Sequence, residues 1–340
     1  MRRRNLGLGI TLTALLILVI LVGLLACQGP TPSPSAPRGR PAPTSPSPSP
    51  APASTPAPPP YFVEALRARP YPGGRIQIGE VMVRDQGFTR YRMSWPAEGQ
   101  VMTGTIAIPD GTGPFPVVLV EHGFIPPERY WVGQDSAIFG DPMAAHGFLV
   151  VAPNWPGYAG SGPGPPGLPP IVGELVTALD LVSSLGTLPQ ADVSHIACVG
   201  HSNGGGICEL AMVVDPRIGA VVLQAPISSD MADNARTWWD QHPEDLGTLG
   251  TPDTDPQGYR HLSPRNYFAP GQAPVLIVQG TADHTIPAAW TRATYDALAQ
   301  RGVTARLLWI PGGDHDLVGA NLATAVAAQE AWIRQAFHLG

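Results

Sequence analysis

The sequence predicts an α/β fold with a mostly parallel central sheet and helices on both faces. From Val117 onward, short apolar runs alternate with longer segments in which apolar residues recur at helical spacing. The short runs are apolar at nearly every position, which is typical of parallel strands buried on both faces. Strands that alternate with helices along a chain build one parallel sheet with helices packed on either side.

The first expected strands are rich in β-branched and aromatic residues and form antiparallel hairpins. They cover Arg75–Arg84, Phe88–Ser94 and Val101–Ile108. The buried parallel strands come next, and we expect them at Val117–Glu121, Phe148–Ala152, His195–Val199, Ile218–Gln224, Val275–Gln279 and Ala305–Ile310. The expected helices are Asp141–His146, Ile171–Leu185, Asn203–Val213, Trp290–Arg301 and Asn321–Phe337.

One segment, Ser228–Gly271, interrupts the alternation of strands and helices. A compact domain rarely contains a plain loop of about 44 residues, so we expect a small cap insertion there. The 280 residues from Tyr61 to Gly340 are enough to bury one core. Residues 61–340 are therefore expected to form a single folded domain that carries the cap at 228–271.

The composition limits the chemistry of this domain. All 20 basic residues of the chain are Arg, which excludes a Walker-type phosphate loop, a Schiff-base lysine and Ser-Lys hydrolysis. Residues 61–340 hold 15 Arg against 26 acidic residues, a formal charge of −11. An acidic domain of this kind binds nucleic acid poorly, so we expect no nucleic-acid partner.

Residues 1–27 have the pattern of a targeting segment. Arg2–Arg4 precede an apolar run from Leu6 to Ala26, which is also long enough to span a bilayer. The run ends in Leu24-Leu25-Ala26-Cys27, which resembles a bacterial lipoprotein box. The resemblance implies cleavage before Cys27 and attachment of lipid to it; the alternative is an uncleaved signal anchor. Both place the folded domain outside the cytoplasmic membrane.

Residues 28–60 hold 14 of the 41 prolines, alternating with Ser, Ala and Thr. This composition cannot bury apolar area and predicts a disordered, extended linker. At about 3.1 Å per residue it would reach roughly 100 Å. We therefore expect an extracytoplasmic domain that is tethered to the bacterial cell membrane.

The strongest chemical motif is Gly200-His201-Ser202-Asn203-Gly204, which matches G-x-S-x-G. It follows an expected apolar strand and opens an expected helix. A nucleophile elbow needs this context, because its serine lies on a strained turn between a strand and a helix. Gly200 and Gly204 leave room where the strand and the helix approach closely. Ser202 is the predicted nucleophile.

The predicted partners of Ser202 follow later strands. Asp283 comes after Val275–Gln279, and His315 comes after Ala305–Ile310. The order Ser, Asp, His is that of α/β-hydrolase triads. His315 would take the serine proton, and Asp283 would orient the imidazole and stabilise its charge. Asp230 competes as the acid, because it follows the preceding strand; Asp314 and Asp316 are interpreted as turn residues.

An oxyanion hole needs two backbone N–H groups that point at the developing charge. We expect them to come from Asn203, directly after the nucleophile, and from Phe124 in Glu121-His122-Gly123-Phe124. His122 is expected to be a packed structural histidine. The histidines are scattered without metal-ligand spacing, so no metal and no cofactor are expected.

Three stretches resemble dienelactone hydrolases and the catalytic domain of the prolyl-oligopeptidase family. They are Asp192–Gly206, His261–Pro287 and Ala305–His315, with Ala152–Tyr158 in the place of the family's loop after its fourth strand. The resemblance implies an α/β-hydrolase fold, an acyl-serine intermediate and no cofactor. Dienelactone hydrolases carry Cys as nucleophile where this sequence has Ser, and true oligopeptidases carry a β-propeller for which it has no room. Both departures favour a carboxylesterase.

Two further expectations concern single residues. Cys198 and Cys208 could pair outside the cytoplasm, but one is expected in a strand and the other on the next helix, which favours small buried free thiols. Aromatic residues that could line a substrate pocket are Trp155, Tyr158, Trp238 and Trp239.

The predicted function is hydrolysis of small-molecule or polymeric carboxylic esters by a Ser-His-Asp triad. A prolyl-oligopeptidase-like serine peptidase is the alternative within the same class. The alternative from another class is a non-catalytic surface module with a hydrolase fold, which the intact triad disfavours. The sequence determines neither the natural ester nor the oligomeric state.

Overall fold

The computed structural model describes residues 57–239, 246 and 248–340. The targeting segment 1–27 with Cys27, and nearly all of the linker 28–60, lie outside these residues. So do residues 240–245 and 247 of the segment interpreted as a cap.

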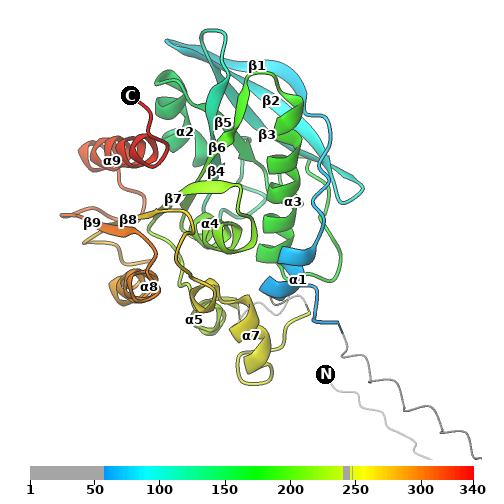
Figure 1. The fold of residues 1–340 in the computed structure, drawn as a ribbon, viewed down its shortest axis with the longest axis vertical. Coiled ribbons are helices and arrows are strands. Elements are labelled where there is room, and N and C mark those ends of the chain that lie inside the picture. Colours follow the sequence, from blue (N-terminus) through cyan, green and yellow to red (C-terminus); the bar gives the residue numbers. More distant parts are fainter. Residues whose placement is uncertain (1–56, 240–245, 247) are drawn as a thin grey trace, which may run out of the picture. The chain divides into compact units, whose positions relative to one another are not determined.

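The described domain is built on one nine-stranded sheet, in the order β1-β2-β3-β5-β4-β6-β7-β8-β9 (Figure 1). The first strands are β1 (Gln77–Asp85), β2 (Phe88–Ala97) and β3 (Gln100–Pro109), and they pair antiparallel as expected. The parallel strands are β4 (Phe115–Glu121), β5 (Leu149–Pro153), β6 (Ala191–His201), β7 (Ile218–Gln224), β8 (Val275–Gly280) and β9 (Ala305–Ile310). The predicted fold class, a mostly parallel α/β sheet, is confirmed.

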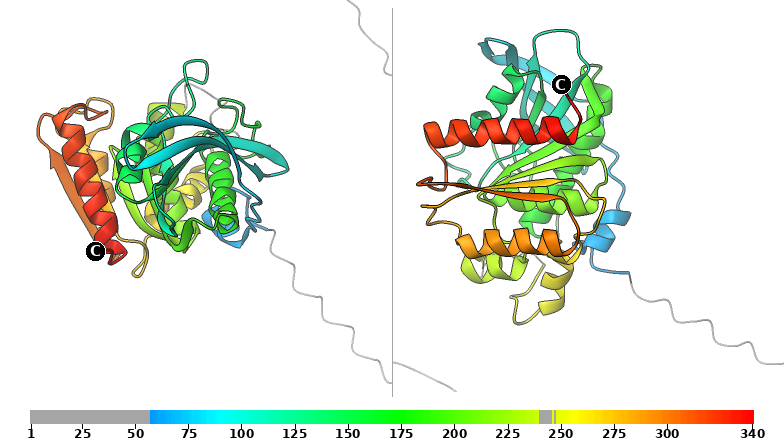
Figure 2. Two further views of the ribbon diagram at one scale, coloured as in Figure 1. Left: turned by 90° about the horizontal axis from the view of Figure 1, so that it is seen from above. Right: turned by 60° about the vertical axis from the view of Figure 1, so that its left-hand side comes forward.

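Helices cover both faces of the sheet (Figure 2). On one face lie α2 (Ser136–Ala145) and α9 (Ala320–Ala336). The other face carries α1 (Val63–Ala68), α3 (Pro170–Ser184), α4 (Asn203–Val214), α5 (Met231–Thr237), α7 (Pro256–Leu262) and α8 (Ala288–Gln300). Strand β6 shows why two cores form: Ile196 and Cys198 face the α4 side, whereas Ala197 and Val199 face the α9 side.

Helix α2 differs most from its predicted bounds. The sequence predicted a short helix over Asp141–His146, in which Pro142 would lie in the first turn, where its missing N–H costs nothing. The helix instead begins at Ser136 and keeps Pro142 in its interior. Phe139 and Met143 are buried against the sheet, and their packing outweighs the local preference of proline.

The expectation that Cys198 and Cys208 are free thiols is wrong: they form a disulfide. Cys198 points to the face of β6 on which α4 packs, and α4 returns along that strand directly after the turn. This crossover brings the two Cα atoms to 5.6 Å, within the range that a disulfide spans. Both residues are fully buried, so the bond joins strand and helix inside the core.

Two segments on the α4 side of the sheet contribute to the core: Pro170–Thr187 and residues 228–271. The stretch Pro170–Thr187 is long and apolar enough to cross a membrane, but 78% of it is buried within the protein, as in a core helix. In the segment 228–271, Met231, Ala235, Tyr259 and Leu262 are buried in the core on the α4 side. The interpretation of 228–271 as a cap stays a prediction.

Candidate active site

The nucleophile elbow is a strained turn between β6 and α4. Ser202 has φ 54° and ψ −117°, a region that residues with a Cβ rarely adopt. A Cβ built on Gly200 would lie 2.2 Å from the Gly204 carbonyl oxygen, and one on Gly204 would lie 2.2 Å from the Glu121 carbonyl oxygen. Only glycine fits at these two positions, as the sequence predicted.

Asp283 and His315 are paired at the carboxyl ends of β8 and β9. The Nδ1 atom of His315 lies 2.9 Å from Oδ2 of Asp283, whose side chain is fully buried. Oδ1 of Asp283 accepts from the backbone N–H groups of Thr285 and Ile286 at 2.7 and 2.9 Å. Burial alone would raise the pKa of Asp283, but the hydrogen bonds from His315 and these amides lower it to about 2. Asp283 is therefore ionised and able to stabilise an imidazolium.

Sequence analysis missed a fourth donor to this carboxylate. The Gln279 Nε2 atom donates to Oδ2 of Asp283 at 2.7 Å, and its Oε1 accepts from the Thr291 hydroxyl at 2.8 Å. Gln279 is fully buried. The available signal was an amide at the end of the otherwise apolar run Val275–Val278, because a buried amide needs hydrogen-bond partners.

The competing acids have other partners. Asp230 caps α5 through the N–H of Ala232 and pairs with Arg265 at 3.4 Å. Asp314 accepts from the Leu317 N–H, as a turn residue does. Among the described acids, Asp283 is the one hydrogen-bonded to the His315 ring.

The expected oxyanion donors lie on either side of the nucleophile. A Cβ on Gly123 would lie 3.3 Å from the Ser202 Cβ, so the loop that carries Phe124 runs against the serine. The Gly123 N–H is already taken by Oδ2 of Asp135, at 2.7 Å. In the described part of the chain no group accepts from the amides of Phe124 or Asn203. Both amides are available for an oxyanion, and their role stays a prediction.

The expected pocket residues Trp155 and Tyr158 are only 2% and 6% exposed. The Trp155 ring stacks on His122 at 3.9 Å, and the Tyr158 hydroxyl donates to the Ile125 carbonyl oxygen. Both rings thus pack against residues 122–125, the segment that carries Phe124 and is called the oxyanion loop below, and their expected contact with substrate stays a prediction. His122 is fully buried in this cluster, which confirms the expected packed structural histidine, and burial lowers its pKa to about 4.

Trp238 and Trp239 are half-buried against the core on the α4 side. The ring of Trp238 meets that of Trp290 edge to face, with centroids 5.4 Å apart. Their expected contact with substrate stays a prediction.

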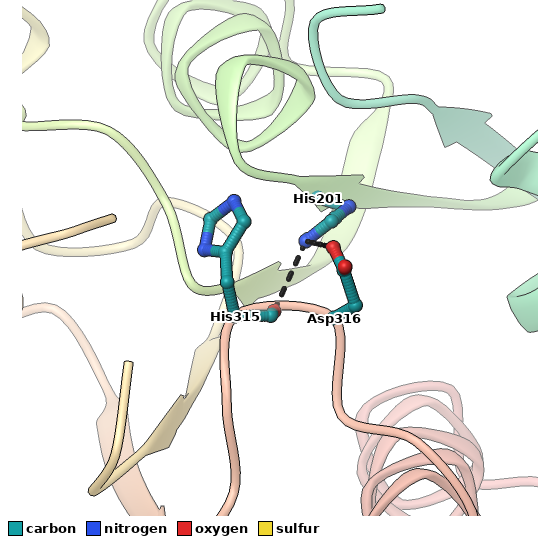
Figure 3. A group of neighbouring side chains, drawn as sticks. All are labelled: His201, His315 and Asp316. Carbon is teal, nitrogen blue, oxygen red and sulfur yellow. Dashed lines mark hydrogen bonds and ion pairs between the residues drawn. The ribbon is translucent and has the colours of Figure 1, made fainter. Parts of the chain in front are cut away.

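His201 connects the nucleophile to the loop of His315. Among the described residues no hydrogen bond joins the Ser202 hydroxyl to the His315 ring. The link runs through His201, the residue before Ser202. The Nε2 atom of His201 lies 3.2 Å from the His315 carbonyl oxygen and 4.0 Å from the Asp316 carboxylate (Figure 3).

The side chains of His201, His315 and Asp316 lie close enough together to suggest a metal centre. A metal ligand needs an unprotonated ring nitrogen. Both ring nitrogens of His201 face acceptors: its Nδ1 lies 2.8 Å from Oδ2 of Asp135, and its Nε2 faces the His315 carbonyl. A ring nitrogen that donates to such an acceptor carries a hydrogen and is not free to bind a metal. The arrangement is therefore that of a hydrogen-bond network.

Part of the chain is similar to known proteins in sequence. Residues 174–340 match the prolyl oligopeptidase family. Dipeptidyl-peptidase 5 of Porphyromonas gingivalis is 29% identical over 190 residues, which cover 51% of this chain and 26% of that protein. The chain thus spans about a quarter of this curated relative.

Solved structures share the fold. Acetyl xylan esterase 1 from Thermoanaerobacterium sp. JW/SL YS485 superposes with a TM-score of 0.57 at 17% identity, over 82% of this chain and 92% of the esterase. Porphyromonas gingivalis dipeptidyl peptidase 4 superposes with a TM-score of 0.59 at 17% identity, over 75% of this chain and 36% of the peptidase. The chain therefore shares its fold with these structures, and its residues 174–340 are similar to the prolyl oligopeptidase family.

Proposed function

We propose that the protein cleaves carboxylic esters through an acyl-serine intermediate. The Ser202 Oγ attacks the ester carbonyl while His315 takes its proton, and the amides of Phe124 and Asn203 bind the resulting oxyanion. The intermediate collapses as the C–O bond breaks, and His315 returns the proton to the leaving alcohol. Water then attacks the acyl-serine with His315 as base, which releases the acid and restores Ser202.

The single observation that carries this proposal is the Asp283–His315 hydrogen bond at the sheet edge that also carries the strained turn at Ser202. A carboxylate that orients a histidine, next to a serine raised on an elbow, is the geometry of acyl transfer.

The extent of the structural matches favours an ester over a peptide. The acetyl xylan esterase corresponds to this chain over 92% of its length, whereas the matching peptidase chains do so over 36–42%. In those peptidases the matched part is the smaller share of the chain.

The test is turnover of p-nitrophenyl esters of increasing acyl length, with Ser202→Ala as the control. Turnover that disappears in the variant supports the proposal, and the length profile gives the size of the acyl pocket. Labelling by a fluorophosphonate should likewise depend on Ser202. A folded protein that is neither labelled nor active on any ester would contradict the proposal and favour a non-catalytic surface module.

A serine peptidase is the second candidate, favoured by the family match over residues 174–340 and by the similarity to dipeptidyl-peptidase 5. Peptidyl anilides assayed beside the esters separate the two functions. Faster cleavage of an anilide than of every ester would reverse the order proposed here.

We further propose that the domain works outside the cytoplasmic membrane, tethered through Cys27. The Cys198–Cys208 disulfide supports this location, because disulfides persist in oxidising compartments. Radiolabelled palmitate should enter the wild-type protein in a bacterial host but not the Cys27→Ala variant. Equal labelling of both would exclude Cys27 as the lipid site.

A further inference from the structure

His201 has an unusual set of neighbours for a buried histidine. Its Nδ1 lies 2.8 Å from Oδ2 of Asp135, and its Nε2 lies 3.2 Å from the carbonyl oxygen of His315. A carbonyl oxygen accepts only, and Asp135 also accepts from the Gly123 N–H with the same Oδ2. A neutral ring can donate to only one of these two acceptors, whereas an imidazolium donates to both.

The charges around the ring fit that state. Burial alone would lower the pKa of His201, but the charge and hydrogen bond of Asp135 outweigh it and raise the pKa. Conversely, His201 outweighs the effect of burial on Asp135 and lowers the pKa of that carboxyl. The titratable groups that face His201 are Asp135 from the loop before α2, His122 from the loop after β4, and His315 and Asp316 from the loop after β9.

The His201 ring contacts or adjoins three parts of the site: the nucleophile, the oxyanion loop and the loop of His315. His201 immediately precedes the nucleophile Ser202. Asp135 holds the Gly123 amide, one residue before the expected oxyanion donor Phe124. The contact of His201 Nε2 with the His315 carbonyl oxygen fixes the backbone of His315, the proposed general base. Asp135 also has φ 65°, an uncommon conformation for a residue with a Cβ, and this strain is compensated by its partners.

We propose that His201 is a positioning residue: its imidazolium, paired with Asp135, holds the His315 loop and the oxyanion loop in register with Ser202. This inference rests on the proposed function. A neutral ring has one N–H and cannot donate to both acceptors, so loss of its second proton releases one of the two loops. The arrangement is therefore complete only while His201 is charged.

The first test is Asp135→Asn. The amide oxygen can still accept from the Gly123 N–H, but the charge that opposes the effect of burial on His201 is gone. We expect kcat on a p-nitrophenyl ester to fall about 10²-fold, the scale of a displacement of about 1 Å at a reacting group, with little change in KM. The alkaline limb of the pH profile, where wild-type His201 loses its proton, should move to lower pH.

A matched control lies on the same strand. His195 and Asp192, at the start of β6, form another His–Asp pair with Nδ1 and Oδ2 2.7 Å apart, but this pair is partly exposed and remote from the sheet's carboxyl edge. Asp192→Asn should leave both kcat and the alkaline limb unchanged. A wild-type kcat and alkaline limb in Asp135→Asn would overturn the inference.

A second measurement needs no variant. In ¹⁵N spectra of the wild-type protein, assigned through its sequence neighbours, His201 should keep hydrogens on both ring nitrogens at pH 7, above the usual histidine pKa of about 6.5. A neutral His201 at that pH would overturn the inference even if Asp135→Asn fails to fold. Fluorophosphonate labelling of wild-type Ser202 distinguishes this failure from a failure of the proposed function. A labelled protein with a neutral His201 overturns only the present inference, whereas a folded protein that is not labelled contradicts the proposed function.

Discussion

The change Asp283→Asn tests the assignment of the catalytic acid most directly. The Asp283 carboxylate accepts four hydrogen bonds: Oδ1 from the amides of Thr285 and Ile286, and Oδ2 from Gln279 and His315. Asparagine keeps the shape but has one oxygen. Whichever way the amide turns, its NH₂ group faces two donors, and each donor left unpaired costs about 1–3 kcal/mol.

The orientation of the amide decides how activity is lost. With its NH₂ toward His315, the ring must turn to the tautomer with hydrogen on Nε2, which cannot accept the Ser202 proton. With its oxygen toward His315, the tautomer survives but the charge that stabilises the imidazolium is lost. The same substitution in a serine-protease triad lowers kcat by about 10⁴, and we expect a similar loss here. This corresponds to about 5 kcal/mol in the activation free energy.

The assay is kcat on a p-nitrophenyl ester, with Asp230→Asn as the matched control. Asp230 follows the preceding strand and pairs with Arg265, so its variant should keep full activity. Circular dichroism confirms that both variants fold. A folded Asp283→Asn enzyme within tenfold of the wild type, or loss of activity in Asp230→Asn, would refute the assignment.

Three other predictions concern stability. Replacing both Cys198 and Cys208 by Ala should lower the free energy of unfolding by about 3 kcal/mol, because the disulfide no longer restricts the short loop between them in the unfolded chain. Urea titration measures this change, and an unchanged urea midpoint would contradict the prediction. Asp283 has a pKa of about 2 in the folded protein and about 3.9 when unfolded, so its stabilising contribution is complete above pH 4 and is lost as pH falls through 2. The wild-type urea midpoint should therefore fall more steeply between pH 4 and 2 than that of Asp283→Asn, and parallel curves would show that the ionised carboxyl adds no stability. Gly204→Ala should abolish soluble expression, because the new Cβ would lie 2.2 Å from the Glu121 carbonyl oxygen, whereas Gly186→Ala, with no heavy atom within 4 Å, should be tolerated.

Most of the sheet could be predicted from the sequence because buried parallel strands carry a strong local signal. Runs such as Val275–Gln279 and Ala305–Ile310 are apolar and are followed by turn residues, and the structure keeps them within one residue of their expected bounds. Helix α2 could not be predicted with the same accuracy. Its start depends on packing against the sheet, which overrides the local preference of Pro142.

The candidate nucleophile, acid and base were also accessible, because the order of strands along the chain places Ser202, Asp283 and His315 at the same edge of the sheet. Their environment was not accessible. No motif marks Gln279 or Asp135 as functional. Gln279 acts by donating to Asp283 in the turn directly after its strand, and Asp135 acts by accepting from Gly123 on another loop. The burial of Trp155 likewise depends on how the loop after β5 folds over His122.

The sequence by itself therefore determined the α/β class, the elbow at Ser202 and the chain order of its partners, because these depend on local periodicity and on glycine at close approaches. Only the tertiary structure decided that Cys198 and Cys208 pair, that Asp283 and not Asp230 meets His315, and that His201 lies between two acceptors. The physical reason is that each of these depends on how two elements pack against each other. The disulfide depends on the packing of β6 and α4, whereas the partners of His315 and His201 come from loops that are far apart in the chain.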